Sequence, residues 1–185
     1  GMHWDDDPLQ QWERFCTELV DTASQQPQVF VHRDVHSCNL LKLARNSPGI
    51  IDFQDAVEGP LTYDLVSLLK DCYIRWPRDR VEAWALVHRE SLVSAGKLNN
   101  IDPETFLRWF DWMGLQRHIK VLGTFARLYL RDSKPSYLDD LPLVATYVEE
   151  ALAEYAGAQP EFAAFGSWFA APPAVTSLPS GLIDQ

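Results

Sequence analysis

The pattern of apolar residues changes at Gly59-Pro60, and this change limits the folds that are open to the chain. Between residues 29 and 53, apolar residues come in short β-branched runs separated by tight turns, which is typical of small strands. After Pro60 they recur every three or four residues, which is typical of helices. The sequence therefore predicts an α+β, mostly helical fold with one small β element near its N-terminus.

The expected elements follow from this periodicity and from the turn-forming residues between them. Strands are expected at 29–31, 40–43 and 50–53, with a turn at 46–49. Helices are expected at 9–23, 65 to about 76, 81 to about 96, 102 through 114 to about 131, and 141–155. The clearest helix start is Asp102-Pro103, with aspartate as N-cap and proline at the first helical position.

The 185 residues divide into three expected parts. Residues 1–7 form a disordered start, in which Gly1 before Met2 resembles the scar of a cleaved expression tag. Residues 8–156 form one domain with its own hydrophobic core. Residues 157–185 form an Ala/Pro-rich tail, whose aromatic side chains could dock on that core: Phe162, Phe165, Trp168 and Phe169.

The chain is acidic, with 16 basic and 26 acidic residues and a formal net charge of −10. This charge argues against binding to nucleic acid or to an anionic membrane, and no stretch is apolar enough to span a bilayer. It fits a cationic substrate or a site that works through Mg²⁺, and equally a solubilising acidic surface. Three widely spaced cysteines without a CxxC motif argue against a disulfide framework or a zinc site, so a cytoplasmic protein is expected.

Unusual polar residues gather in the predicted β element. Asp34 lies in a loop after a strand, Asn39 follows five residues later, and Asp52 ends a strand 13 residues beyond that. Two strands joined by a tight turn bring Asn39 and Asp52 together, and each offers an oxygen suited to Mg²⁺. Asp34 can reach the same place, where a carboxylate that does not bind the metal can accept a proton from a hydroxyl.

The spacing His32-x-Asp34-x-x-x-x-Asn39, followed by Ile51-Asp52-Phe53, resembles the catalytic loop (32–39) and metal segment (51–55) of the aminoglycoside phosphotransferase and choline kinase family. That family shares the protein-kinase-like fold, in which the related patterns are H-R-D-x-x-x-x-N and D-F-G. Gln54 stands where protein kinases have glycine, as in many small-molecule kinases. The stretches 52–65 and 116–123 strengthen the likeness, which is greatest to bacterial kinases of the anomeric hydroxyl of N-acetylmuramate and N-acetylglucosamine.

The resemblance implies a role for each matching position, with ATP as co-substrate and Mg²⁺ as cofactor. Asp34 resembles the catalytic base, and Asn39 and Asp52 resemble the metal ligands. His32 resembles the residue that braces the loop from behind. Asp64 resembles a carboxylate that pins the loop through backbone amides, although it could also be an acidic residue favoured by a helix dipole.

Four further residues are candidates for contact with the substrate, and each has a plainer interpretation. Asp55 and Glu58 could touch substrate hydroxyls, but Glu58 could equally face solvent. His36 lies where the substrate approaches, but could be an exposed loop histidine. Arg117 could face the cleft or could pair with surface acids.

The N-terminal lobe of such a fold normally supplies a Gly-rich loop and a lysine. No glycine lies between Gly1 and Gly49, and the first lysine, Lys42, follows Asp34. We therefore expect only the C-terminal lobe, with the N-lobe absent. Apolar surface over 8–31 and 40–53 would then be uncovered, and a homodimer through it is expected.

Three hypotheses follow for function. The chain is a sugar phosphotransferase that is weak or inactive alone, since phosphoryl transfer depends on positioning both reactants. Alternatively, it phosphorylates an aminoglycoside or another cationic alcohol. Thirdly, it is a non-catalytic binding module that retains the lobe as a scaffold.

Overall fold

A computed structural model describes residues 8–170, and the expected start (1–7) and the end of the tail (171–185) lie outside the described residues. Its elements, in chain order, are α1 (Pro8–Ser24), β1 (Gln28–Val31), the 3₁₀ helix η1 (Ser37–Asn39), β2 (Leu40–Leu41), β3 (Gly49–Ile50), β4 (Val57–Pro60), α2 (Tyr63–Leu69), α3 (Arg78–Ser94), α4 (Pro103–Asp132), the 3₁₀ helix η2 (Pro135–Leu138), α5 (Leu141–Tyr155) and α6 (Pro160–Ala170). The mostly helical α+β prediction is confirmed. No helix in the described part of the chain is long and apolar enough to cross a membrane.

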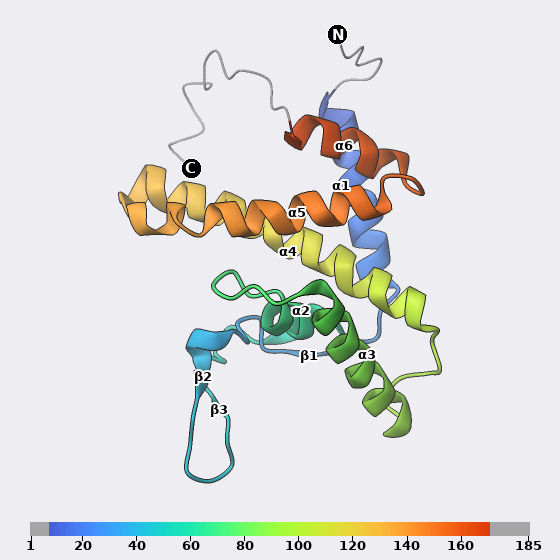
Figure 1. Cartoon of the computed structure of the whole chain (residues 1–185), viewed down its shortest axis with the longest axis vertical. Helices are drawn as coiled ribbons and strands as arrows, with labels where there is room; N and C mark the ends of the chain where they lie inside the picture. Colours follow the sequence, from blue (N-terminus) through green and yellow to red (C-terminus); the bar gives the residue numbers. More distant parts are fainter. Residues whose placement is uncertain (1–7, 171–185) are drawn as a thin grey trace.

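Helix α4 is the central element of the fold. It has 30 residues, so at 1.5 Å per residue it is roughly 45 Å long. The predicted start is confirmed, because the Asp102 side chain accepts a hydrogen bond from the Thr105 amide at 2.8 Å and Pro103 occupies the first helical position. Figure 1 shows α5 lying along α4, with α1 and α6 at one end and α2 and α3 below it.

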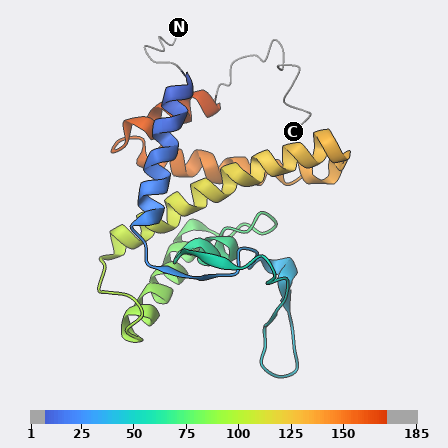
Figure 2. The same ribbon diagram turned by 180° about the vertical axis from the view of Figure 1, so that it is seen from behind.

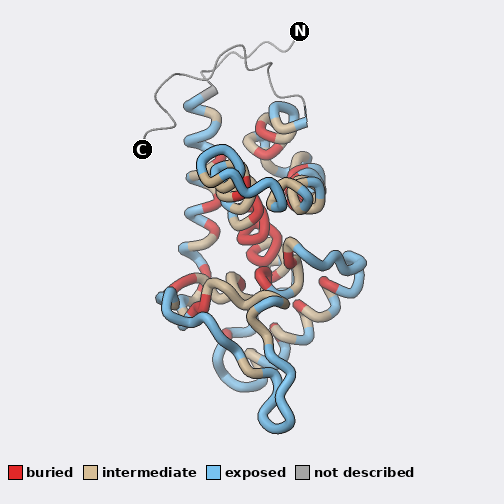
Figure 3. Tube along the Cα trace, turned by 90° about the vertical axis from the view of Figure 1, so that its left-hand side faces the viewer, coloured by how far each residue is buried: buried red, intermediate tan, exposed pale blue. Residues whose placement is uncertain are grey.

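Two buried clusters form the core, and α4 contributes to both. The first joins α4 to α1, α5 and α6 through Phe15, Leu19, Trp112, Leu115, Val148, Ala151, Leu152, Phe162 and Phe165. The second joins α4 to α2 and α3 through Val66, Val81, Ala85, Leu98, Phe106, Trp109, Phe110 and Met113. Buried residues gather where the helices cross, whereas the hairpin that projects from the body is exposed (Figure 3). Because α4 lies between the clusters, the helices on its two sides are fixed relative to each other.

The tail forms a helix that its sequence pattern did not predict. Helix α6 inserts two aromatic side chains into the first cluster, and the Phe15 and Phe165 rings stack with centroids 4.4 Å apart. The expected docking of the tail aromatics is therefore observed for Phe162 and Phe165, which are buried, and for Phe169, which packs against the cluster. Trp168 stacks on Phe165 at a centroid distance of 5.5 Å.

The predicted small β element consists of two separate pairs of antiparallel strands. β1 pairs with β4, with Val31 opposite Val57, and β2 pairs with β3, with Leu40 opposite Ile50. The strand predicted at 50–53 ends at Ile50, and the amide of Ile51 donates to the carbonyl of Asn39 at 3.2 Å, next to the end of the loop 32–39. Strand β4 was not predicted; Figure 2 shows it beside β1.

Strand β4 packs closely because it contains a glycine. A Cβ atom at Gly59 would lie 3.3 Å from Cγ2 of Val31, which is tighter than ordinary contact. The small residue therefore lets β4 lie against the end of β1, directly before the catalytic loop. The geometry of this pair sets the direction in which residue 32 and its successors leave the sheet.

Large apolar side chains are exposed over much of 8–31 and 40–53, as expected. Exposed fractions reach 74% for Phe30, 67% for Phe53 and 61% for Val20. Large exposed apolar patches tend to be interaction sites. The homodimer inferred from this surface stays a prediction.

Candidate active site

The loop 32–39 begins at the end of β1 and is held first by Asp64. The two oxygens of this carboxylate accept hydrogen bonds from the amides of His32 at 2.7 Å and Arg33 at 2.9 Å. Arg33 has φ 77°, a left-handed conformation that costs a non-glycine residue energy and persists only where its surroundings hold it. Asp64, in the first turn of α2, supplies that restraint. The predicted pinning of the loop through backbone amides is observed.

His32 lies behind the loop, as the resemblance implies. It is buried, and its Nδ1 atom accepts from the amide of Asp34 at 3.4 Å. Its Nε2 atom is buried without a hydrogen-bond partner among the described residues. The imidazole thus fixes the backbone that carries the Asp34 carboxylate.

A second carboxylate, Asp71, holds the other end of the loop, and the sequence did not single it out. Its Oδ2 atom accepts from the Ser37 amide at 3.0 Å, and its Oδ1 atom accepts from the Tyr73 amide at 3.2 Å. The residue is buried. The sequence pattern extended the helix past position 71, where an aspartate looks like an ordinary surface residue. In the structure α2 ends at Leu69, so Asp71 belongs to a turn.

Asn39 and Asp52 meet as the spacing predicted. The Nδ2 atom of Asn39 donates to the backbone carbonyl of Asp34 at 3.0 Å and lies 3.4 Å from Oδ2 of Asp52. With the amide nitrogen turned to the loop, Oδ1 is the Asn39 atom that can face an ion. Asp52 has φ 71°, and the side-chain amide of Gln54 donates to its Oδ1 atom at 2.7 Å.

This donor set fits a magnesium ion. Amide and carboxylate oxygens are hard ligands, and Mg²⁺ in proteins is usually bound through one or two carboxylates, with water and phosphate oxygens completing the shell. Within residues 8–170 no group of three or more His, Cys, Asp or Glu side chains is placed to hold a metal ion. The pair described above, Asn39 and Asp52, offers two oxygen ligands on a half-buried and an exposed side chain.

A cavity of about 220 Å³ lies beside Asp34. One wall is the catalytic loop and the turn after α2, and the other is the face of α4 that follows Gln116. Its lining residues are Asp34, His36, Cys72, Tyr73, Arg117, Lys120, Val121, Thr124 and Phe125. Two of the predicted substrate candidates, His36 and Arg117, are thus brought to the same hollow as the predicted base.

Arg117 faces the catalytic loop and not surface acids. Its Nη1 atom donates to the carbonyl of Arg33 at 3.1 Å and to the Tyr63 hydroxyl at 3.3 Å. The guanidinium also lies over the Tyr63 ring, 5.4 Å from its centroid. Arg117 therefore helps to hold the loop, and the remaining cation of the cavity wall is Lys120.

Of the other candidates, His36 lines the cavity, whereas Asp55 and Glu58 do not. His36 packs edge-on against Tyr73, with centroids 5.9 Å apart, and its Nε2 atom lies 3.4 Å from Nδ2 of Asn39. Asp55 and Glu58 are exposed and are not part of the cavity lining. The carbonyl of Asp55 accepts from Arg33 Nη1 at 3.3 Å, which links the two segments through the backbone. Contact of these two carboxylates with a substrate stays a prediction.

Cys72 is a poor nucleophile in this setting. Burial, followed by the nearby Asp71 carboxylate, raises the pKa of its thiol to about 12. The pKa of the Tyr73 hydroxyl is also raised, first by burial. Both groups keep their protons near neutral pH, so the part of the cavity wall formed by Cys72 and Tyr73 is uncharged.

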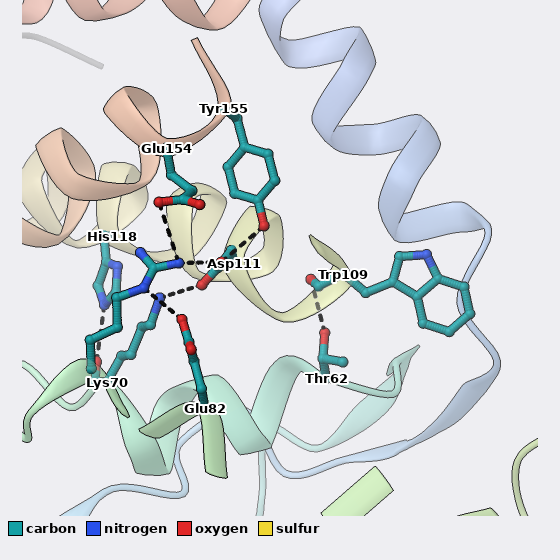
Figure 4. Close-up of polar contacts among 9 residues, drawn as sticks. Thr62, Lys70, Glu82, Trp109, Asp111, His118, Glu154 and Tyr155 are labelled. Carbon is teal, nitrogen blue, oxygen red and sulfur yellow. Dashed lines mark hydrogen bonds and ion pairs between the residues drawn. The ribbon is translucent and has the colours of Figure 1, made fainter. Parts of the chain in front are cut away.

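A buried polar network behind the site fixes the end of α2. Lys70 Nζ contacts Asp111 Oδ1 at 2.6 Å, and the Tyr155 hydroxyl donates to the other oxygen of Asp111 at 3.0 Å (Figure 4). His118 Nε2 donates to the carbonyl of Lys70 at 3.0 Å. Burial lowers the pKa of His118 to about 3, so the imidazole is neutral near pH 7. Because Asp71 directly follows Lys70, this network also positions the carboxylate that holds Ser37.

The chain is similar to curated kinases of amino sugars. It is 42% identical over 170 residues to an N-acetylmuramate/N-acetylglucosamine kinase of Pseudomonas putida, which covers 92% of this chain and 49% of that protein. It is 43% identical over 181 residues to the protein of the same description from Pseudomonas aeruginosa, covering 98% of this chain and 50% of the relative. The chain thus spans about half the length of the curated relatives it matches.

The Phosphotransferase enzyme family also matches the chain, over residues 3–93. This region includes the anchored loop, the metal segment and the carboxylates that hold the loop. The likeness to the Pseudomonas proteins continues through the helices that build the cavity wall. The chain therefore belongs to the phosphotransferase enzyme family.

Proposed function

We propose that the chain carries the acceptor side of an ATP- and Mg²⁺-dependent phosphotransferase that acts on a hydroxyl of an amino sugar of the N-acetylmuramate or N-acetylglucosamine type. The observation that carries this proposal is the arrangement around Asp34. Its side chain lines a cavity large enough for part of a small sugar, and its carbonyl is hydrogen-bonded to Asn39, which lies beside Asp52. One carboxylate thus faces the acceptor while two oxygen ligands face the donor.

We assign the chemical roles accordingly. Asp34 orients the acceptor hydroxyl and takes its proton, an effect typically worth about 10²–10⁴-fold in rate. Asn39 and Asp52 would hold Mg²⁺, which offsets charge on the donor phosphates when bound. His32, Asp64 and Asp71 hold the loop in the required shape, which matters because phosphoryl transfer depends mostly on positioning.

We further assign residues 8–156 to the C-terminal lobe of a protein-kinase-like fold. The support is the mostly helical body, the two small sheets near the N-terminus and the place of the motif between them. Because the chain spans about half of its relatives, we expect little turnover from these residues alone. The ATP requirement and the free thiols of Cys16, Cys38 and Cys72 favour the cytoplasm.

The net charge of the chain favours the alternative of a cationic alcohol as substrate, but the charges that line the cavity oppose it. The chain is acidic as a whole, with a net charge of −10, but the cavity wall carries Arg117 and Lys120 against the single carboxylate of Asp34. A polycationic aminoglycoside would meet like charge at this wall. We therefore prefer the amino sugar.

The test is a fusion of residues 8–185 to the N-terminal half of the Pseudomonas putida relative. With Mg²⁺ and ATP, we expect ADP formation that depends on N-acetylmuramate or N-acetylglucosamine. Asp34→Asn should lower the rate at least 100-fold while nucleotide binding stays the same, because only the proton acceptor is lost. Asp79→Asn, an exposed residue of α3 that does not line the cavity, is the matched control and should keep most of the activity.

Two results would contradict the proposal. If Asp34→Asn keeps more than about a tenth of the rate, Asp34 is not the base. If the fusion binds nucleotide and turns over neither sugar, the scaffold hypothesis replaces it.

A further inference from the structure

We propose that Lys120 recognises a carboxylate on the substrate, so that the cavity beside Asp34 selects an acidic amino sugar over a neutral one. The inference rests on the proposed function and names the part of the molecule that would discriminate between its two sugars. N-acetylmuramate carries a carboxylate on its lactyl ether, and N-acetylglucosamine lacks this group. The lactyl ether replaces the free 3-hydroxyl of N-acetylglucosamine, and its carboxylate is the one difference in charge between the two sugars.

The cavity wall on α4 is a single helix face. Arg117, Lys120 and Thr124 are three and four residues apart, and side chains at this spacing lie along one side of a helix. All three line the cavity, together with Asp34 from the opposite wall. The hollow therefore has an acidic group on the loop side and cationic groups on the helix side.

The two cationic side chains, Arg117 and Lys120, differ in the contacts that they make within the protein. Arg117 donates to the Arg33 carbonyl and to Tyr63, and its guanidinium lies over the Tyr63 ring. Lys120 is exposed, and among residues 8–170 its ammonium group has neither a hydrogen bond nor an ion pair. The ammonium can thus turn to a ligand without giving up a protein contact, whereas Arg117 cannot.

The polarity of the cavity fixes how an acidic sugar would lie. The hydroxyl that receives the phosphoryl group must face Asp34, because that carboxylate is the proton acceptor and lies beside Asn39. A carboxylate elsewhere on the sugar is repelled from Asp34 and attracted to Lys120. The uncharged walls formed by Tyr73 and Phe125 suit the faces of the ring between them. Lys120 is therefore a specificity-determining residue, not a catalytic one.

Equilibrium binding of the two sugars to the full chain tests this directly. Titration calorimetry or ligand-observed NMR with N-acetylmuramate and N-acetylglucosamine gives the ratio of the two dissociation constants. We expect the wild-type chain to prefer N-acetylmuramate. Lys120→Met keeps the aliphatic stem and should weaken N-acetylmuramate about five-fold, the factor expected for a solvent-accessible ion pair, and leave N-acetylglucosamine unchanged.

Two further variants separate charge recognition from other effects. Lys120→Arg keeps the charge and should restore most of the preference. Lys134→Met, after the end of α4, removes the same net charge at a residue that does not line the cavity and should change neither constant. Raising the salt concentration should shrink the wild-type preference and leave the preference of Lys120→Met unaffected.

The outcomes distinguish this inference from the proposed function. If both sugars bind and Lys120→Met leaves their ratio unchanged, or weakens both equally, Lys120 does not read the carboxylate although the cavity is the sugar site. If neither sugar binds and a cationic aminoglycoside does, the inference and the proposed substrate class are both wrong.

Discussion

Residues 32–39 and residues 51–55 both supply groups to the proposed site, but the helical body holds them to different degrees. The first segment is fixed by the carboxylates of Asp64 and Asp71 and by the guanidinium of Arg117. Every residue of the second segment is exposed, and the Asp52 carboxylate contacts only Asn39 and Gln54 in the described part of the chain.

This difference indicates that residues 32–39 are preorganised by the protein, whereas residues 51–55 are not. The loop that carries Asp34 is shaped by buried or half-buried bonds before any substrate arrives, which is the preorganisation that positioning requires. The segment that carries Asp52 has few buried contacts, so it opens at low cost in free energy. We therefore infer that substitutions in the anchors of the loop affect stability, whereas substitutions in the metal segment affect binding.

The largest effect is expected for Asp64→Ala. It leaves the amides of His32 and Arg33 without their charged acceptor and removes the restraint on a left-handed residue. We expect the free energy of unfolding to fall by about 3 kcal/mol, measured by urea denaturation. Asp55→Ala, an exposed carboxylate in the other segment, is the control and should change it by less than about 0.5 kcal/mol. If the two substitutions lower the free energy of unfolding equally, residues 32–39 are not held more firmly than residues 51–55.

Acid should lower the free energy of unfolding through protonation of His118, which belongs to the network behind the loop 32–39. Burial lowers the pKa of this imidazole to about 3 in the folded chain, whereas the unfolded chain takes up the proton near pH 6.5. The contribution of neutral His118 to the free energy of unfolding is therefore fully present above about pH 6.5. It is lost as the pH falls toward 3. Between pH 7 and pH 5 we expect a loss of about 2 kcal/mol from this group. His118→Gln, which keeps a donor for the Lys70 carbonyl, should flatten that part of the profile; an unchanged slope would contradict the assignment.

Asp71→Ala should act on the far end of the loop. The Ser37 amide loses its acceptor, and the turn after α2 loses its bond to the Tyr73 amide. We expect a destabilisation of about 1–2 kcal/mol, together with faster hydrogen exchange at Ser37. If exchange at Ser37 does not change while stability falls, Asp71 supports the turn alone and not the loop.

The smallest effect on stability is expected for Asp52→Asn. This side chain is exposed, so the free energy of unfolding should change by less than about 0.5 kcal/mol. In the fusion described above, Mg²⁺-dependent binding of ATP should nevertheless be lost, because one of the two oxygen ligands loses its charge. A destabilisation above about 1 kcal/mol would show that residues 51–55 are anchored after all.

The sequence predicted best what depends on local chemistry. The spacing of Asn39 and Asp52 indicated their contact, and Asp102-Pro103 marked a helix start, because turns and caps are set by neighbouring residues. Asp64 was assigned its anchoring role through the family resemblance, and its two bonds to backbone amides agree with it.

What the sequence did not reveal depends on tertiary contacts. Strand β4 has little β propensity and exists because β1 pairs with it. Helix α6 was hidden in an Ala-rich tail and is held by Phe15 from the other end of the chain. Asp71 gained its role only because α2 ends at Leu69, two residues before Asp71 and well short of the end predicted near residue 76. In the sequence, nothing separates Lys120 from the other lysines. Only the structure shows that it lines the same cavity as Asp34.

Helix α4 has a consequence for how the molecule responds to damage. Its first half is shared by both hydrophobic clusters, and its second half forms the cavity wall. We therefore expect a packing defect in either cluster to shift the same helix. Phe15 and Phe106 do not line the cavity, yet we expect substitutions at either residue to alter the width of the cavity and hence the affinity for whatever ligand it binds.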